Sequence, residues 1–431
     1  MQEQIFEILN IIWMFLKTWG WVIIPFILIK PFLFLYLWWR NTVWLDAVNF
    51  IVLEIIPSKE VLRPIKAMET VFNGLWHFYD PPGNFREIWL EGKLQLGFSL
   101  EIVGIDGSPH FFIRIPEAAR NLVESVLYSQ YPDLEIKEVE DYTKKVSQDV
   151  PNRDWDAWGC DYELLKDDFY PIKTYSSFYE EKPDVAKEEK RIDPISNLLE
   201  GMAKFKPGEQ LWIQMYCTPV SHLAESKNYF ENAKKAVDKL VKRPGLSPPD
   251  KPIVEKAIDV LITGEPPAEL EKQERAVLPE MELTPGEKKV VASIEEKIGK
   301  YSFNCGIRFI LVAKKDVFFR PNKAIPMGFF DLFSTANFNG LKPMKKTITK
   351  VQTVWLWFLD NKRLYVRKRR LFRNYSQRLN PFFPWSGGTF ILNIEELASL
   401  FHFPGMGVTA APSVSRVEAK RGEAPANLPT E

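Results

Sequence analysis

The residues with the clearest capacity for chemistry form a basic, aromatic-rich stretch at 342–378. Only one acid, Asp360, interrupts it, and tryptophan, tyrosine and phenylalanine are interleaved with the charges. Guanidinium and ammonium groups neutralise phosphates, and aromatic rings stack on bases, so this composition is typical of nucleic-acid binding. The stretch contains twelve cations: Lys342, Lys345, Lys346, Lys350, Lys362, Arg363, Arg367, Lys368, Arg369, Arg370, Arg373 and Arg378.

Two other interpretations of this stretch stay open. The same residue types suit an anionic lipid surface, and the cations could instead pair with the acidic run at 161–193 of the same chain. Within the stretch we predict six polyanion-binding residues: Lys362, Arg363, Arg367, Arg369, Arg373 and Arg378.

The arrangement of these cations depends on the element that carries them. The sequence predicts one or two strands over 353–370, and side chains of equal parity share one face of a strand. Arg367, Arg369 and Arg373 are therefore expected to act together, with Arg370 on the opposite face.

Catalytic motifs are missing from the sequence. It contains no G-x-x-x-x-G-K-[ST] phosphate loop, no G-x-G-x-x-G and no H-E-x-x-H. Cys217 and Cys305 lie in apolar segments and are predicted to be core thiols, and His402 is predicted to be packed at a helix end. Carboxylate runs such as 161–168 are typical of solvated faces. We therefore predict a protein that is not an enzyme, without a cofactor or a metal site.

Length and composition favour a globular protein of more than one domain. The chain has 431 residues, of which 46% are hydrophobic and 26% charged, and its formal net charge is zero. These values exclude wholesale disorder and a polytopic transporter. Three cysteines without a C-x-x-C pair favour a reducing compartment over a disulfide framework.

An apolar segment at 19–39 predicts one transmembrane helix. It carries a single charge, Lys30, and tryptophan and tyrosine residues flank both ends. A cleaved signal peptide is disfavoured, because no basic region precedes the segment and no small-residue cleavage site follows it. Arg40 and Arg63 follow the span, so the positive-inside rule predicts a single-pass protein of the inner (cytoplasmic) membrane with its soluble part in the cytoplasm.

Hydrophobic periodicity predicts an α+β fold for the rest of the chain. Alternating residues at 94–104 and 110–115 flank Asp106-Gly107, a hairpin turn signal, and a helical pattern follows at 117–130. This order of elements indicates a split βαβ, ferredoxin-like unit, and a looser version follows. The predicted domains are a membrane anchor (1–45), a first ferredoxin-like unit (46–220), a helical and Pro-rich excursion (221–300), a second α+β unit with the basic stretch (301–403) and a flexible tail (404–431).

The order of several segments resembles the N-terminal region of membrane-bound type IV secretion (conjugation) ATPases of the HerA/FtsK class, in the form found in small-genome bacteria. The resemblance covers residues 53–429. It is carried by the segments VLRPIKAMETVFNGLW, HFFIRIPEAARNLVESVLYSQYPDLEIKEVEDYT, EQLWIQMYCTP, KIGKYSFNCGIRFILVAKK, FFDLFSTANFNGLKP and ELASLFHFP.

This resemblance implies a non-catalytic role in translocation. In such proteins the ATPase motor follows a Pro-rich linker similar to APANLPTE, but no Walker motif occurs here, so no ATPase residue can be carried over. The implied function is a membrane-anchored accessory subunit of a DNA-translocation machine that docks or orients a separately encoded motor ATPase. The implied partners are the membrane, that ATPase, nucleic acid and further copies of the chain. The alternative is a membrane-surface scaffold that binds anionic lipid or nucleic acid through 342–378.

Overall fold

The computed structural model describes residues 2–57, 63–178, 193–221, 227–241, 283–352 and 357–404. The chain divides into two compact units. The smaller unit comprises Met1–Phe50 and Asp80–Leu96, and the larger comprises Ile51–Tyr79 and Gly97–Glu431.

The smaller unit consists of a long helix and a short π-helical turn that packs against it. The helix α1 (Gln2–Asp46) contains Pro25 and Pro31, and the turn is η2 (Glu87–Glu91). No helix in the described part of the chain is long and apolar enough to cross a membrane. The predicted transmembrane helix at 19–39 and the predicted inner-membrane location are therefore wrong. The prediction counted apolar residues and accepted Lys30 and the neighbouring proline as tolerable interruptions of a span.

The larger unit is built on one sheet, which has nine strands within the described residues. Their order is β4-β1-β3-β2-β6-β7-β5-β8, and β9 pairs with β7. The pairs β1–β4, β2–β3, β2–β6, β6–β7, β5–β7, β5–β8 and β7–β9 are antiparallel. The strands are β1 (Phe50–Ile56), β2 (Phe98–Ile105), β3 (Ser108–Pro116), β4 (Glu135–Val139), β5 (Trp155–Leu164), β6 (Glu209–Val220), β7 (Ser302–Lys314), β8 (Leu341–Pro343) and β9 (Phe390–Asn393).

Two βαββαβ groups stand side by side in this sheet. In the order β4-β1-β3-β2, helix α2 (Lys66–Leu75) follows β1 and α3 (Arg120–Gln130) follows β3. The order β8-β5-β7-β6 repeats the arrangement, with α4 (Ser196–Ala203) after β5 and α8 (Ala324–Asp331) after β7. Strands β2 and β6 pair along eight residues, so the two groups form one continuous sheet.

The structure therefore corrects the predicted fold class. The α+β character is observed, but the predicted N-terminal transmembrane helix is wrong, because no described helix is long and apolar enough to cross a membrane. The predicted first unit, 46–220, included β5 and β6, whereas these strands stand with β7 and β8 in the sheet. The two groups join into one sheet because their edge strands, β2 and β6, satisfy each other's backbone hydrogen bonds.

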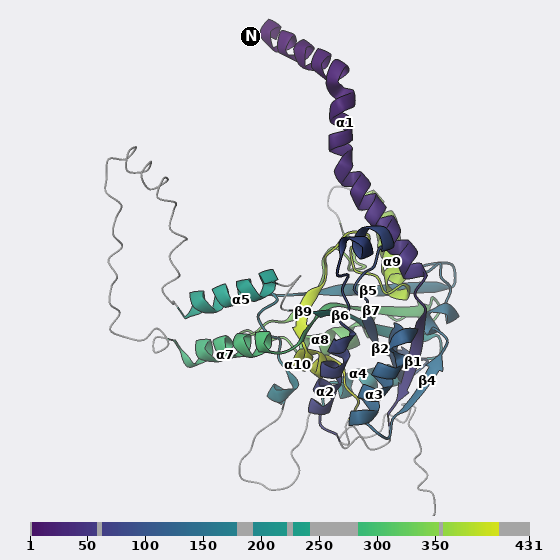
Figure 1. The fold of residues 1–431 in the computed structure, drawn as a ribbon. Helices are drawn as coiled ribbons and strands as arrows, with labels where there is room; N and C mark the ends of the chain where they lie inside the picture. Colours follow the sequence, from purple (N-terminus) through teal and green to yellow (C-terminus); the bar gives the residue numbers. More distant parts are fainter. Residues whose placement is uncertain are drawn as a thin grey trace, which may run out of the picture. The chain divides into compact units, whose positions relative to one another are not determined.

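Helices cover both faces of the sheet (Figure 1). Ile102 and Leu311 contribute to the larger core, which contains residues of α2, α3, α4, α8 and α10 (Ile394–Leu400). Their neighbours Val103 and Ile310 point to the opposite face, as strand alternation requires. There they pack with residues of α9 (Asp360–Ser376), so α9 lies on the other face of the sheet.

A helix pair and several short turns complete the described residues. Helices α5 (Lys227–Leu240) and α7 (Pro285–Gly299) pack against each other through Ala233 and Ile294. Most of the predicted Pro-rich excursion at 243–286, and the tail after 404, lie outside the described residues. The 3-10 turns are η1 (Trp76–Phe78), η3 (Glu117–Ala119), η4 (Tyr142–Lys145), η5 (Tyr175–Phe178), η7 (Arg320–Lys323) and η8 (Trp357–Leu359).

The predicted hairpin is confirmed and the predicted basic strands are wrong. β2 and β3 pair antiparallel, and Asp106 and Gly107 between them adopt positive φ angles of 52° and 85°. The basic stretch, by contrast, forms the helix α9, and residues 353–356 lie outside the described residues. The apolar residues of α9 explain the difference: Leu371, Phe372 and Tyr375 follow helical spacing and are buried against the sheet.

Candidate functional site

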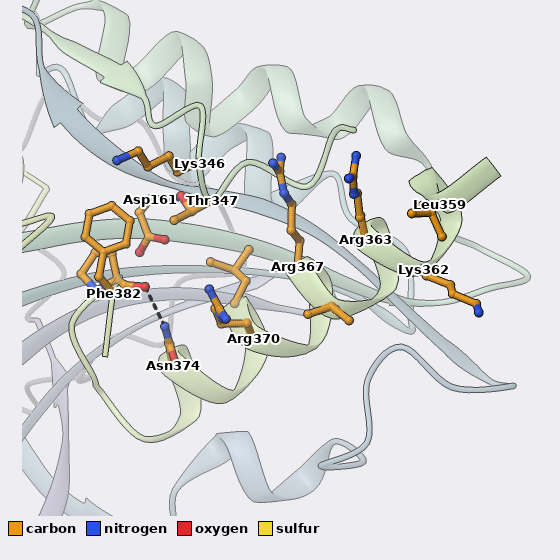
Figure 2. Close-up of a pocket in the computed structure, with 13 residues that line it drawn as sticks. Asp161, Lys346, Thr347, Leu359, Lys362, Arg363, Arg367, Arg370, Asn374 and Phe382 are labelled. Atoms are coloured by element: carbon orange, nitrogen blue, oxygen red, sulfur yellow. Dashed lines mark hydrogen bonds between the residues drawn. The ribbon is translucent and has the colours of Figure 1, made fainter. Parts of the chain in front are cut away.

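A cavity of about 550 Å³ lies along one side of helix α9 (Figure 2). The helix forms one wall, the segments around Lys346 and Phe382 form others, and β5 contributes Asp161. We call this cavity the α9 pocket. Its lining residues are Asp161, Lys346, Thr347, Leu359, Lys362, Arg363, Val366, Arg367, Arg370, Leu371, Asn374, Pro381 and Phe382.

The helical repeat explains why these cations line one cavity. Arg363, Arg367 and Arg370 are four and three residues apart, and residues with this spacing lie on one face of a helix. The adjacent face is anchored by Leu371 and Tyr375, which are buried against the sheet. The sheet therefore fixes the rotation of α9, and this rotation turns the three arginines toward the pocket.

Among the described residues, no acid pairs with the cations that line the α9 pocket. Nη1 of Arg367 donates hydrogen bonds to the carbonyl oxygens of Ile348, at 3.0 Å, and Lys350, at 3.2 Å. Nζ of Lys346 lies 5.5 Å from the centre of the Phe382 ring. Within the described ranges, none of the five lining cations, namely Lys346, Lys362, Arg363, Arg367 and Arg370, forms an ion pair with an acid.

The one carboxylate in the lining is already balanced. Oδ1 of Asp161 lies 3.0 Å from Nε of Arg308, and both side chains are buried. Burial raises the pKa of Asp161, although the facing charge of Arg308 opposes the rise. The lining of the α9 pocket therefore contains five cations and one carboxylate, and that carboxylate already pairs with Arg308. The described lining is strongly positive.

The structure separates the six predicted polyanion-binding residues. Lys362, Arg363 and Arg367 line the α9 pocket. Arg369 lies outside it and pairs with Asp149, with 2.5 Å between nitrogen and oxygen. Arg373 is exposed outside the pocket and lies 3.4 Å from the side-chain oxygen of its neighbour, Asn374. The expected grouping of Arg367, Arg369 and Arg373 is wrong, because α9 is a helix.

Arg378, the sixth residue, is buried in a polar network under the sheet. Its Nε and Nη2 atoms donate to the carboxylate of Glu101 at 2.9 and 3.0 Å, and its guanidinium also pairs with Asp141. Tyr142 Oη and Gln214 Nε2 donate further hydrogen bonds to Glu101, at 2.7 and 2.9 Å. The geometry of Arg378 is that of a structural ion pair.

Sequence reasoning missed two cations and the aromatic wall of the α9 pocket. Arg370 was expected on the opposite face from Arg367, but the two share the pocket face of the helix. A helical reading of Leu364, Leu371 and Tyr375 would have found Arg370. Lys346 belongs to the basic stretch but is not among the six predicted residues, and tertiary contacts bring it and Phe382 to the pocket.

Among the described residues, the acids of the run at 161–193 do not pair with helix α9. Within the described residues of the run, Asp161 pairs with Arg308, and Glu163 lies 3.6 Å from Lys342. Residues 179–192 lie outside the described residues. The acids that pair with α9 precede the run: Asp156 contacts Lys368 at 2.6 Å, and Asp149 contacts Arg369.

A second cavity, also of about 550 Å³, has compensated charges. In its lining, Lys297 lies 3.0 Å from Glu396, with both side chains fully buried, and Lys300 lies 2.5 Å from Glu395. Burial raises the pKa of Glu396, and Lys297 opposes that shift. Because Lys297 and Lys300 already face acids, and Glu69 and Glu296 also line the cavity, it has less capacity for an anionic ligand than the α9 pocket.

The thiols and the described histidines form no catalytic pair. Cys160, Cys217 and Cys305 are buried, and the sulfur atoms of Cys217 and Cys305 lie 3.6 Å apart. His402 is buried between Asp193 and the carbonyl oxygen of Ala398. The described residues contain no group of three or more His, Cys, Asp or Glu side chains that could hold a metal ion.

No protein-family model matches the chain, and no curated protein matches it.

Proposed function

We propose that this chain binds nucleic acid, through phosphate contacts in the α9 pocket. The observation that carries the proposal is the set of five cations around one cavity, without acidic partners among the described residues. Like charges held close together repel one another, so a phosphate-bearing ligand is favoured both by direct contacts and by relief of this repulsion. Arginine forks also match the two oxygens of a phosphodiester.

The shape of the site favours nucleic acid over a lipid surface. The cations surround a concavity between a helix and two loops, so they can contact a chain that enters the cavity. A flat bilayer surface contacts protruding groups most readily. Anionic lipid remains the competing ligand for the test, and the translocation role implied by the resemblance stays a prediction.

Two double variants of the full-length chain test the proposal. Arg363→Gln/Arg370→Gln removes two charges from the pocket, and Arg369→Gln/Arg373→Gln removes two charges from the same helix outside it. Fluorescence anisotropy with a labelled single-stranded oligonucleotide would measure the dissociation constant over a range of salt concentrations. We expect the pocket variant to lose about tenfold or more in affinity, and its slope of log K against log salt to fall by about 1.4.

The control variant, Arg369→Gln/Arg373→Gln, shows how much affinity is lost when two charges are removed from α9 outside the pocket. It should lose about twofold or less, because its charges are outside the pocket and Arg369 is already paired. Equal losses in both variants would mean diffuse attraction by net charge, without a site. A wild-type chain that binds anionic vesicles and no oligonucleotide would overturn the proposal in favour of lipid.

A further inference from the structure

The α9 pocket has apolar lining residues as well as cations. Its apolar lining residues are Leu359, Val366, Leu371, Pro381 and Phe382. In Figure 2, the side chains of Arg363 and Arg367 point away from the axis of α9, whereas Phe382 stands at the end of the pocket nearest Asp161. Phosphates alone would not require such an apolar cavity, so the cavity suits a ligand that also has a flat or apolar part.

Neighbouring residues fix the position of the Phe382 side chain. The side-chain amide of Asn374 donates to the carbonyl oxygen of Pro381, at 3.2 Å, and Asn374 itself is buried. Gly388 lies directly against the Phe382 ring, because a Cβ atom added to it would come within 3.3 Å of that ring. Its φ of +78° is a conformation that other residues rarely adopt. The loop therefore fixes the position of the ring at the pocket wall.

Asp161 and Thr347 give the cavity a polar side near Phe382 (Figure 2). Asp161 lines the pocket and is 1% exposed. Its Oδ1 atom faces Nε of Arg308 at 3.0 Å, and its backbone N–H donates to Oγ1 of Thr347 at 3.2 Å. Thr347, beside Asp161, adds a hydroxyl group.

From these observations we infer that the α9 pocket takes one unpaired nucleobase, stacked on Phe382, while the lining cations hold the adjoining phosphates. This inference rests on the proposed nucleic-acid binding and specifies its ligand as single-stranded. A volume of about 550 Å³ is sufficient for a nucleoside. A base in a duplex would first have to leave its stack, and this free-energy cost disfavours duplex ligands.

Binding of three labelled ligands to the full-length chain tests the inference. The ligands are a single-stranded oligonucleotide, an abasic oligonucleotide with the same number of phosphates, and the corresponding duplex. We expect the base-bearing single strand to bind about tenfold more tightly than the abasic one. A 2-aminopurine base within the strand should change its fluorescence on binding.

Variants of Phe382 separate stacking from folding. Phe382→Leu should reduce the preference for bases to about twofold, while affinity for the abasic strand stays unchanged. Phe382→Tyr should retain the preference, because it keeps the aromatic ring. Phe319→Ala serves as the matched control, since Phe319 is an exposed aromatic residue that does not line the pocket.

The possible failures of the two proposals are distinguishable. If abasic and base-bearing strands bind equally and both depend on Arg363 and Arg370, the base pocket is refuted and phosphate binding stands. If the duplex binds as tightly as the single strand, the base pocket is also refuted. If neither strand binds, the proposed function fails. Competition of either strand by vesicles of anionic phospholipid alone would assign the cavity to lipid.

Discussion

At the scale of single residues, burial separates the arginines of the basic stretch into two kinds. Arg363 and Arg370 line a cavity without acidic partners among the described residues, whereas Arg378 is 4% exposed and pairs with Glu101 and Asp141. These residues look alike in the sequence. The acids that neutralise Arg378 are more than 200 residues away along the chain, so only the fold reveals them.

We expect Arg378→Met to destabilise the protein by about 3–5 kcal/mol, because it leaves the buried Glu101 carboxylate without its cation. Urea unfolding followed by tryptophan fluorescence would measure the difference. The exposed Arg369→Met variant is the control and should leave the unfolding free energy nearly unchanged, because exposed ion pairs contribute little to stability. Equal values for the two variants would show that the Arg378 network does not stabilise the fold.

The same network predicts opposite pH dependences for the wild type and the Arg378→Met variant. Burial alone would raise the pKa of Glu101. The charge and hydrogen bonds of Arg378 outweigh the effect of burial, so the pKa of Glu101 is lowered overall. A lowered carboxyl pKa stabilises the fold above the unfolded pKa, about 4.3, and this contribution is lost as pH falls through the folded pKa.

In Arg378→Met, burial is no longer opposed, so the folded pKa of Glu101 rises above the unfolded value. At neutral pH the variant is destabilised by the charged Glu101, which has lost its cation. This destabilisation diminishes as Glu101 becomes protonated at lower pH. We expect the variant's deficit in unfolding free energy, measured against wild type between pH 7.5 and about 5, to shrink as pH falls. A deficit that is constant over this range would mean that Glu101 remains charged in the variant.

At the scale of elements, the sequence identified the hairpin and misread the basic helix. The Asp106-Gly107 pair gave a local turn signal that no tertiary contact needed to override. In α9, the few apolar residues are separated by many charges, so their helical spacing was not recognised. The spacing becomes informative only when the burial of these residues against the sheet is known. Arg363 and Arg367 were identified as candidates by charge alone, whereas Phe382 and Lys346 join the site through folding.

Because α9 positions the pocket through its buried face, we expect Leu371→Ala to affect both stability and binding. Leu371 is 3% exposed, so its truncation should cost about 2–5 kcal/mol through lost burial and a cavity. Oligonucleotide affinity should fall as well, since the helix loses part of its anchor. Leu332→Ala, at a residue that is 40% exposed, should change both quantities little. An affinity unchanged in Leu371→Ala would show that α9 does not position the site.

At the scale of the whole molecule, the continuous sheet couples the two βαββαβ groups. β2 and β6 pair through eight residues at their junction, where apolar side chains such as Ile102 and Trp212 contribute to the cores on the two faces of the sheet. Paired edges of this length leave no boundary at which one group could unfold while the other keeps its backbone hydrogen bonds.

We therefore expect the larger unit to unfold as one cooperative structure. Hydrogen exchange followed by mass spectrometry should give β2 and β6 the same, slow exchange rates, with amides of both strands exposed only in global unfolding. Exchange of β2 at a clearly lower free energy than β6 would mean that the groups are independent domains joined by a weak edge contact.

The central claim, that the α9 pocket is a nucleic-acid site, is tested most directly by locating a bound strand. A thymidine oligonucleotide can be cross-linked to the full-length chain by ultraviolet light, and the adducts mapped by mass spectrometry. We predict adducts at Phe382 and in the segments that carry Lys346 and Arg363, with loss of the signal in Arg363→Gln/Arg370→Gln. Adducts confined to other basic elements, such as α5 with Lys234 and Lys235, would contradict the assignment.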